Sequence, residues 1–595
     1  MEYLIVIGII LIYSSLQTII FKKKIEQIIP ISVVEIVLII YLTGMFDNLK
    51  LGVIIVEIMA IIQLAIILYI FCKQKEKKQV IEIIKRILTP GLVVYTILCS
   101  ISIVINKGRI FLDYDEFNHW ARIIKNMFMY NTYGTNSESM VIFNEYPPFT
   151  STFQYLFLAI KNMYSEDIVI TAQNILYISL IIPTTKDIGW NNKIKNLILI
   201  IPFIILLPMI FYKNFYLNIL VDGMLGITFA LTVFYSFERE ENNIFKFFKI
   251  LSTIIILCLT KTSGIALALL TIIIILVKAF KDKKKKEIIE TSIIILLATI
   301  LTFSWYIKVD SAEKRWNFNQ YIETENKTKE EMLNIAKTFG NAIFYNQNIT
   351  DKNFTVFAVF FILICTNFYV LKKQNKKEYK YYSIAMLTAI PIYLMSLMIT
   401  YMTIFDLEEA QTLTSFNRYC STILLANGLF QFLGFLDTNK NINIKQIVVI
   451  FTVLISILPQ KNIYEKYIES KNYILTSNIN RDIFTKLKMY KNKLNKEDSI
   501  LYITGTNVDA KFITSMNQYE IMPIKISNSK TGVFSSEEDF INMITDGGYT
   551  HLFIYRMQDT VKEKLKNLFE DNYVGDDILY KISKENGKIF LERVR

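Results

Sequence analysis

Long apolar runs are the feature that most limits what this chain can fold into. Residues 4–20, 52–72, 194–210 and 265–280 are nearly unbroken stretches of hydrophobic side chains. A helix of about 20 such residues crosses the ~30 Å hydrocarbon layer of a membrane, and shorter runs can cross inside a bundle. Because 53% of the residues are hydrophobic and only 20% are charged, a soluble protein would have to bury all of these runs at once. The sequence therefore predicts an all-α polytopic membrane protein and excludes a soluble enzyme.

The chain has a net charge of +12, and its basic residues fall in short clusters between the apolar runs. These clusters indicate which loops face the cytoplasm. Cytoplasmic loops of membrane proteins carry an excess of Lys and Arg, so nucleic acid is not expected as a partner. Placing the basic clusters inside puts the N-terminus and the loops 107–150 and 307–352 outside. The short apolar stretch 151–163 is then expected to lie along the outer interface. About 14 crossings result, near 4–20, 28–46, 51–72, 88–106, 167–184, 197–211, 219–236, 247–260, 264–279, 288–306, 353–371, 381–401, 414–436 and 446–460.

The chain divides into three parts by composition. Residues 1–87 hold the first transmembrane helices, and residues 88–460 form the main transmembrane bundle with its outer loop. After Pro459, short apolar segments such as 499–504 and 551–555 read as strands, and 540–545 and 561–569 read as amphipathic helices. This alternation predicts a small α/β domain over 461–595, which the helix count places outside the membrane.

Cysteine and histidine usage narrows the chemistry further. The five cysteines form no CxxC pair, and the chain has only two histidines. Neither a disulfide framework, nor a thiolate metal site, nor a multi-histidine metal centre is expected. The abundance of Ile, Lys and Asn is typical of a low-GC bacterial genome, so a bacterial plasma membrane is the expected location.

The first large outer loop carries the most informative polar residues. It begins FLDYDEFNHWARIIKNMF and ends FNEYPPFT. Asp115 and Glu116 stand just beyond a membrane helix, with Asp113 before them and His119 and Trp120 one turn later. Carboxylates there can act as a general base or hold a divalent cation. The alternative is that they only solvate the loop and begin a helix, where acidic residues are favourable.

These motifs resemble the GT-C class of integral membrane glycosyltransferases, which includes protein O-mannosyltransferases and lipid A aminoarabinose transferases. Asp115-Glu116 and Tyr146-Pro147-Pro148 match, in order and spacing, the Asp-Glu and Tyr/His-Pro-Pro motifs of that class. The resemblance implies a GT-C-like helix bundle that transfers a sugar from a polyprenyl-phosphate carrier to an acceptor on the outer face. It also implies that the acidic residue of the loop acts as base or as part of the acceptor site. The roughly three helices before the acidic loop depart from the family pattern.

Four further residues complete the candidate site. Asp222, in YLNILVDGMLG, corresponds to a second acidic residue of the family, and Lys261, in LTKTSG, suits a phosphate anion. Arg418 offers bidentate hydrogen bonds to phosphate, with Tyr419 beside it. The alternatives are helix capping for Asp222, snorkelling to the interface for Lys261 and an ion pair with Glu408 or Glu409 for Arg418.

The sequence therefore predicts an inverting glycosyltransferase that uses a polyprenyl-phosphate-linked sugar and a cell-envelope acceptor, among membrane lipids. Asp115, Glu116 and Asp222 are the candidate catalytic residues, and His119, Trp120, Tyr146, Lys261, Arg418 and Tyr419 the candidate substrate-binding residues. No cofactor is required, although Asp115 and Glu116 can ligate a divalent metal. A transporter or glycan flippase is the main alternative. It is disfavoured because charges concentrate at helix ends and no internal repeat is visible. A surface-polysaccharide polymerase or ligase and a non-enzymatic scaffold are the others.

Overall fold

The computed structural model describes most of the chain, which forms two compact units. The first unit comprises Met1–Arg109, Met127–Thr135 and Phe143–Ser470, and the second comprises Ile110–Asn126, Asn136–Ile142 and Lys471–Arg595. The structure describes residues 2–74, 76–136, 139, 141, 143–191, 193–238, 240–311, 327–345, 349, 354–373, 377–438, 463–505, 509–527, 530–531, 536–585 and 588–595. The segment 446–460, expected to be the last crossing, lies outside these ranges.

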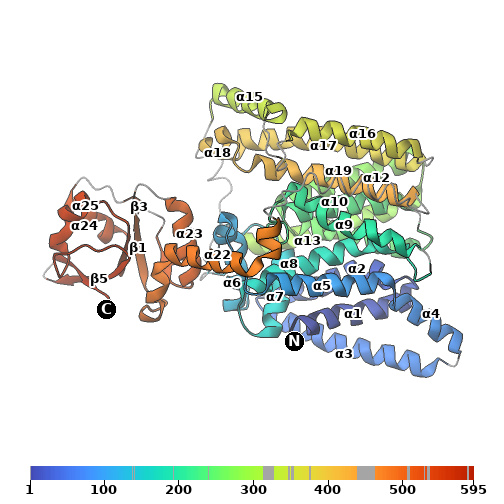
Figure 1. Ribbon diagram of the computed structural model, residues 1–595, viewed down its shortest axis with the longest axis horizontal. Helices are drawn as coiled ribbons and strands as arrows, with labels where there is room; N and C mark the ends of the chain where they lie inside the picture. The colour runs from blue at the N-terminus through green and yellow to red at the C-terminus, as the bar shows by residue number, and fades with distance from the viewer. Residues whose placement is uncertain are drawn as a thin grey trace. The chain divides into compact units, whose positions relative to one another are not determined.

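The first unit is a bundle of helices, drawn from blue to orange in Figure 1. Within the described residues, ten of its helical segments are long and apolar enough to cross a membrane, as expected for a multi-pass membrane protein. The helices are α1 (Glu2–Phe21), α2 (Ile25–Gly44), α3 (Leu49–Lys73), α4 (Lys77–Ile87), α5 (Pro90–Asn106), α7 (Phe149–Lys161), α8 (Glu166–Ile181), α9 (Leu197–Phe211), α10 (Asp222–Phe237), α11 (Asn243–Cys258), α12 (Thr262–Lys281), α13 (Lys285–Asp310), α15 (Lys329–Tyr345), α16 (Val356–Lys373), α17 (Lys377–Thr403), α18 (Leu407–Thr412) and α19 (Phe416–Thr438), with the short turns η2 (Ile182–Thr185), η3 (Ile194–Asn196) and η4 (Tyr464–Ile468).

Local sequence sets where several of these helices begin. The side chain of Asn48 accepts a hydrogen bond from the amide of Leu51 at the start of α3. Thr89 does the same for Leu92 at the start of α5, and Pro90 follows it at the first helical position. Such caps satisfy amide groups that have no partner within the helix, and proline fits there because it lacks that amide.

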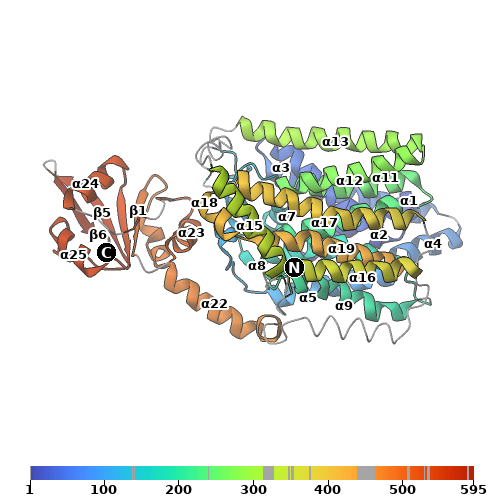
Figure 2. The same ribbon diagram turned by 90° about the horizontal axis from the view of Figure 1, so that it is seen from above.

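Helices α10 and α19 form the centre of the bundle and pack closely on each other. Every residue of α10 is buried. The approach depends on Gly226, where an added Cβ would lie 2.5 Å from the carbonyl oxygen of Thr422 on α19. Helices α16 and α17 pack on the other side of α19, and the three lie side by side in Figure 2.

Two features of the bundle add to the expectations from sequence. Helix α7, at the stretch expected along the interface, is buried over Phe149–Leu158 and packs against α1, α2, α3 and α8. It is therefore an enclosed element of the bundle. In addition, Glu35 and Glu57 lie near the middle of α2 and α3, and Glu35 accepts a hydrogen bond from Gln17 of α1. Charges are thus not confined to helix ends.

The C-terminal part of the second unit is an α/β domain, as predicted. Its sheet has the order β2-β1-β4-β5-β6, with β3 also paired to β1. Strands β2, β3 and β4 run parallel to β1. Strand β5 pairs antiparallel with β4, and β6 pairs antiparallel with β5. The predicted strands 499–504 and 551–555 are confirmed as β1 and β4. The elements are α22 (Ser470–Phe484), η5 (Lys486–Lys493), β1 (Ser499–Thr504), α23 (Ala510–Ile521), β2 (Lys525–Ile526), β3 (Lys530–Thr531), α24 (Glu537–Asp546), β4 (His551–Tyr555), α25 (Asp559–Leu565), η6 (Lys566–Leu568), β5 (Ile578–Glu585) and β6 (Lys588–Arg593).

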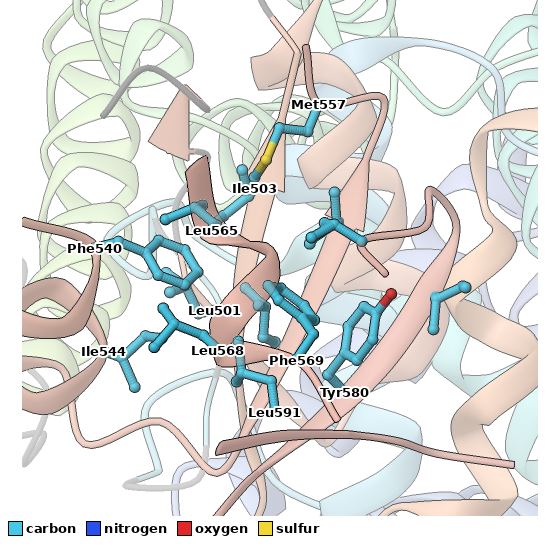
Figure 3. Close-up of a cluster of buried hydrophobic side chains, with 14 of the residues drawn as sticks. Leu501, Ile503, Phe540, Ile544, Met557, Leu565, Leu568, Phe569, Tyr580 and Leu591 are labelled. Carbon is cyan, nitrogen blue, oxygen red and sulfur yellow. The ribbon is translucent and has the colours of Figure 1, made fainter. Parts of the chain in front are cut away.

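Alternation along the strands separates the two faces of this sheet. Leu501 and Ile503 of β1 point to one face, where they meet Phe540 and Ile544 of α24 (Figure 3). Leu565 of α25 belongs to the same apolar cluster. Because β1 and β4 are buried on both faces, their sequences are short apolar runs, which is the pattern from which the strands were predicted.

Candidate functional site

A buried carboxylate with two cationic partners is the centre of the candidate site in the bundle. Asp222, the first residue of α10, is only 4% exposed. Its Oδ1 lies 2.9 Å from Nζ of Lys261, and its Oδ2 lies 3.4 Å from Nε of Arg418. Three of the residues predicted from sequence are therefore brought together, although they are far apart along the chain.

The three residues come from the N-terminal ends of three helices. Asp222 begins α10, Lys261 immediately precedes α12, and Arg418 lies in the first turn of α19. The N-terminus of a helix carries a partial positive charge and exposes amide groups. The cluster itself holds one Lys and one Arg beside Asp222, so its cations and the helix ends attract negative charge. Such a site is suited to an anion.

Aromatic rings surround the two cations. The ammonium of Lys261 lies 5.9 Å from the ring centre of Tyr146 and 5.2 Å from that of Tyr419. The guanidinium of Arg418 lies 5.1 Å from the ring centre of Tyr419. The hydroxyl of Tyr212 donates a hydrogen bond to the carbonyl oxygen of Arg418 at 3.0 Å. Such contacts between cations and aromatic rings help to fix the positions of Lys261 and Arg418.

Tyr146 reaches this cluster because its loop is tied to the bundle on both sides. The amide of Phe149 donates to the carbonyl oxygen of Leu259, just before Lys261, at 2.6 Å. The indole of Trp305 on α13 donates to the carbonyl oxygen of Glu145 at 2.8 Å. Tyr146 of the Tyr-Pro-Pro motif therefore lies beside Lys261.

Glu145 is a candidate that the sequence analysis missed. Within the described part of the chain, its buried Oε2 has no hydrogen-bond partner. Burial raises the pKa of its carboxyl to about 7, which is the range in which a general base works best. The only signal in the sequence was its place directly before Tyr146. A lone Glu in a polar loop is too common to be singled out on that ground.

The acidic segment of the first loop belongs to the second unit. It forms η1 (Glu116–Trp120) and α6 (Ala121–Tyr130), with the last residues of α6 in the first unit. Oε2 of Glu116 accepts hydrogen bonds from the amides of Leu112 and Asp113, at 2.8 and 2.9 Å. Glu116 therefore helps to form the start of the helix, and its catalytic role stays a prediction.

The other candidates of this segment have different surroundings. Asp115 is partly exposed, whereas His119 and Trp120 are buried and their rings pack edge to face. Among the described residues, no group of three His, Cys, Asp or Glu side chains could hold a metal ion. The catalytic role of Asp115 and the binding roles of His119 and Trp120 stay predictions.

A second ion cluster lies at the opposite end of α10. Glu238, which follows its last residue, pairs with both Lys186 and Lys249. Nearby, Glu240 pairs with Lys23 from the α1–α2 connection. A small pocket adjoins this cluster between η2, α10 and α19. Each end of α10 therefore carries one buried carboxylate that pairs with two cations: Asp222 at the start and Glu238 at the end.

Comparison of the chain with protein-family models, with curated proteins and with solved structures gives no match.

Proposed function

We propose that this protein is a membrane glycosyltransferase that moves a sugar from a polyprenyl-phosphate carrier to a cell-envelope acceptor. The cluster of Asp222, Lys261 and Arg418 carries the proposal. Lys261 and Arg418, at the N-termini of α12 and α19, supply the positive charge that a lipid phosphate needs. The site is enclosed by a bundle of apolar helices. The order of the Asp-Glu and Tyr-Pro-Pro motifs in the first loop adds support.

In the proposed reaction, the acceptor hydroxyl attacks the anomeric carbon of the sugar. A new carbon–oxygen bond forms to the acceptor, the bond to the phosphate breaks, and the polyprenyl phosphate leaves with the electron pair. Lys261 and Arg418 bind the phosphate and stabilise the charge that develops on it. Attack from the opposite side inverts the anomeric configuration.

The proton of the acceptor hydroxyl has to pass to a base. Glu145 is suited to this role because its carboxyl has a pKa near neutral pH and lies next to Tyr146 of the phosphate site. Asp115, the candidate from sequence, is assigned to the acceptor, whose hydroxyl it binds and orients.

A transporter or glycan flippase is the second candidate. It is favoured by Glu35 and Glu57, because carboxylates in the middle of membrane helices commonly mark ion or substrate pathways. Such a protein would bind the lipid phosphate without transferring its sugar. Binding and transfer therefore have to be measured separately.

The experiment compares Arg418→Ala with Lys186→Ala, which removes a cation from the cluster at the opposite end of α10. We expect Arg418→Ala to weaken binding of a polyprenyl phosphate about 10- to 100-fold, since a hydrogen bond to a charged group contributes about 1.5–3 kcal/mol. Lys186→Ala should leave that affinity unchanged. Binding is measured on purified protein, and transfer is measured with a labelled polyprenyl-phosphate sugar. Equal affinities in the two variants would reject the phosphate site, and binding without transfer in the wild type would favour the flippase.

A further inference from the structure

The acidic segment of the first loop packs on the C-terminal domain, although more than 350 residues separate them. The ring of Phe117, next to Glu116, contacts the rings of Phe512 and Tyr519 on α23, at 5.9 and 5.5 Å between centroids. Phe111 contacts Tyr519 as well, at 6.1 Å. These apolar contacts bury one side of the segment.

Polar contacts fix the segment in one position on α23. Arg122 is 2% exposed, and it donates to the side chain of Gln518 and to the carbonyl oxygen of Ser515. The ammonium of Lys125 donates to the carbonyl oxygen of Tyr519 and lies 4.3 Å from the centre of its ring. Both cations come from one face of the helix that begins at Glu116.

A third cation ties the beginning of the segment to the domain. Arg481 of α22 donates to the carbonyl oxygen of Phe111 at 3.3 Å and pairs with Glu520 at 2.7 Å. Its guanidinium also lies 5.0 Å from the ring centre of Phe117. The segment is thus held before and after Asp115.

These contacts are more specific than a chance association of two surfaces. Burial lowers the pKa of Arg122 to about 10, so its guanidinium stays charged at neutral pH. A buried charge is costly unless its hydrogen bonds are made. Nη2 of Arg122 makes such bonds with Gln518 and Ser515, and moving the segment would remove them. The arrangement therefore favours one register of the segment on α23.

We propose that the C-terminal domain is a positioning element that holds Asp115 where it can bind the acceptor. Arg122 is the positioning residue on the loop side, and Gln518 is its counterpart on α23. This inference rests on the proposed function, because it gives Asp115 its role toward the acceptor.

The test uses the full-length protein with Arg122→Ala and Gln518→Ala. The control is Leu565→Ala, which makes a cavity in the apolar cluster on the other face of the sheet. We expect the first two variants to raise the KM for the acceptor and lower kcat at least 10-fold, with unchanged affinity for polyprenyl phosphate. In an Asp115→Asn background, Arg122→Ala should cause little additional loss, since both changes remove the same contribution. Leu565→Ala should leave the KM for the acceptor unchanged, although it lowers thermal stability as much as the other two variants do.

Hydrogen exchange of the backbone over 110–126 gives a readout that does not depend on activity. Arg122→Ala and Gln518→Ala should lower protection there, and Leu565→Ala should not. Lost protection with normal transfer, or equal kinetic losses in all three variants, would overturn the positioning role. If the wild type transfers no sugar, the proposed function fails. In that case, unchanged hydrogen-exchange protection of 110–126 in Arg122→Ala would still show that the C-terminal domain does not position this segment through Arg122.

Discussion

Replacing Asp222 by Asn should destabilise the protein and at the same time strengthen its hold on a lipid phosphate. The substitution preserves the size of the side chain but removes the charge that Lys261 and Arg418 share at 2.9 and 3.4 Å. Breaking a buried ion pair from one side typically costs about 3–5 kcal/mol, because the remaining charge is uncompensated. Here two cations are left, so we expect a loss in this range.

The phosphate of a bound polyprenyl lipid can replace the missing carboxylate. A ligand at about 100 times its Kd stabilises the folded state by about 2.7 kcal/mol, which would recover most of the loss. The wild type should gain less at the same lipid concentration, since its cations are already partly neutralised. The assay is thermal unfolding of the purified protein over a series of polyprenyl phosphate concentrations.

Glu238→Gln is the matched control. It also removes a carboxylate paired with two cations, but at the other end of α10. Its loss of stability should be similar, whereas polyprenyl phosphate should not restore it preferentially. If the lipid stabilises Asp222→Asn no more than the wild type, or stabilises Glu238→Gln equally, the cluster is a structural ion pair and the phosphate site is wrong.

Two further predictions address the base and the topology. Because burial raises the pKa of Glu145 to about 7 and a base acts in its ionised form, transfer should fall about tenfold per pH unit below that value. Glu145→Gln should lower the rate about 100-fold or more and abolish this limb of the pH–rate profile; an unchanged limb would exclude Glu145 as the base. A single cysteine in place of Glu563, in a background without the five native cysteines, should react with an impermeant thiol reagent in intact cells. Reaction only after permeabilisation would place the C-terminal domain inside.

Most of the helical framework could be predicted from sequence because apolar runs of the right length have few alternatives. The starts of α3 and α5 even show their caps in Asn48 and Thr89. Helix α7 was harder to place, since its 13 residues are too few to cross a membrane in the usual way. Only the neighbouring helices show that it is enclosed.

The candidate site could be predicted in its parts but not in its assembly. Asp222, Lys261 and Arg418 stood out as charges at the ends of apolar runs, but their convergence depends on how α10, α12 and α19 pack. The first loop was expected to be one polar segment. It divides between the two units, and Phe111 and Phe117 contact aromatic residues of α23. No local pattern in the sequence reveals such a distant partner.

The length of α10 has a consequence for the surrounding lipid. Its 16 residues span about 24 Å at ~1.5 Å per residue, and both of its ends carry buried charge. The hydrocarbon layer of a typical bilayer is about 30 Å thick. Either the bilayer thins locally around this part of the protein, or at least one ion cluster lies below the level of the lipid head groups. In the second case, if the deeper cluster is the one at Asp222, a carrier lipid would reach Lys261 and Arg418 by lowering its phosphate into the membrane.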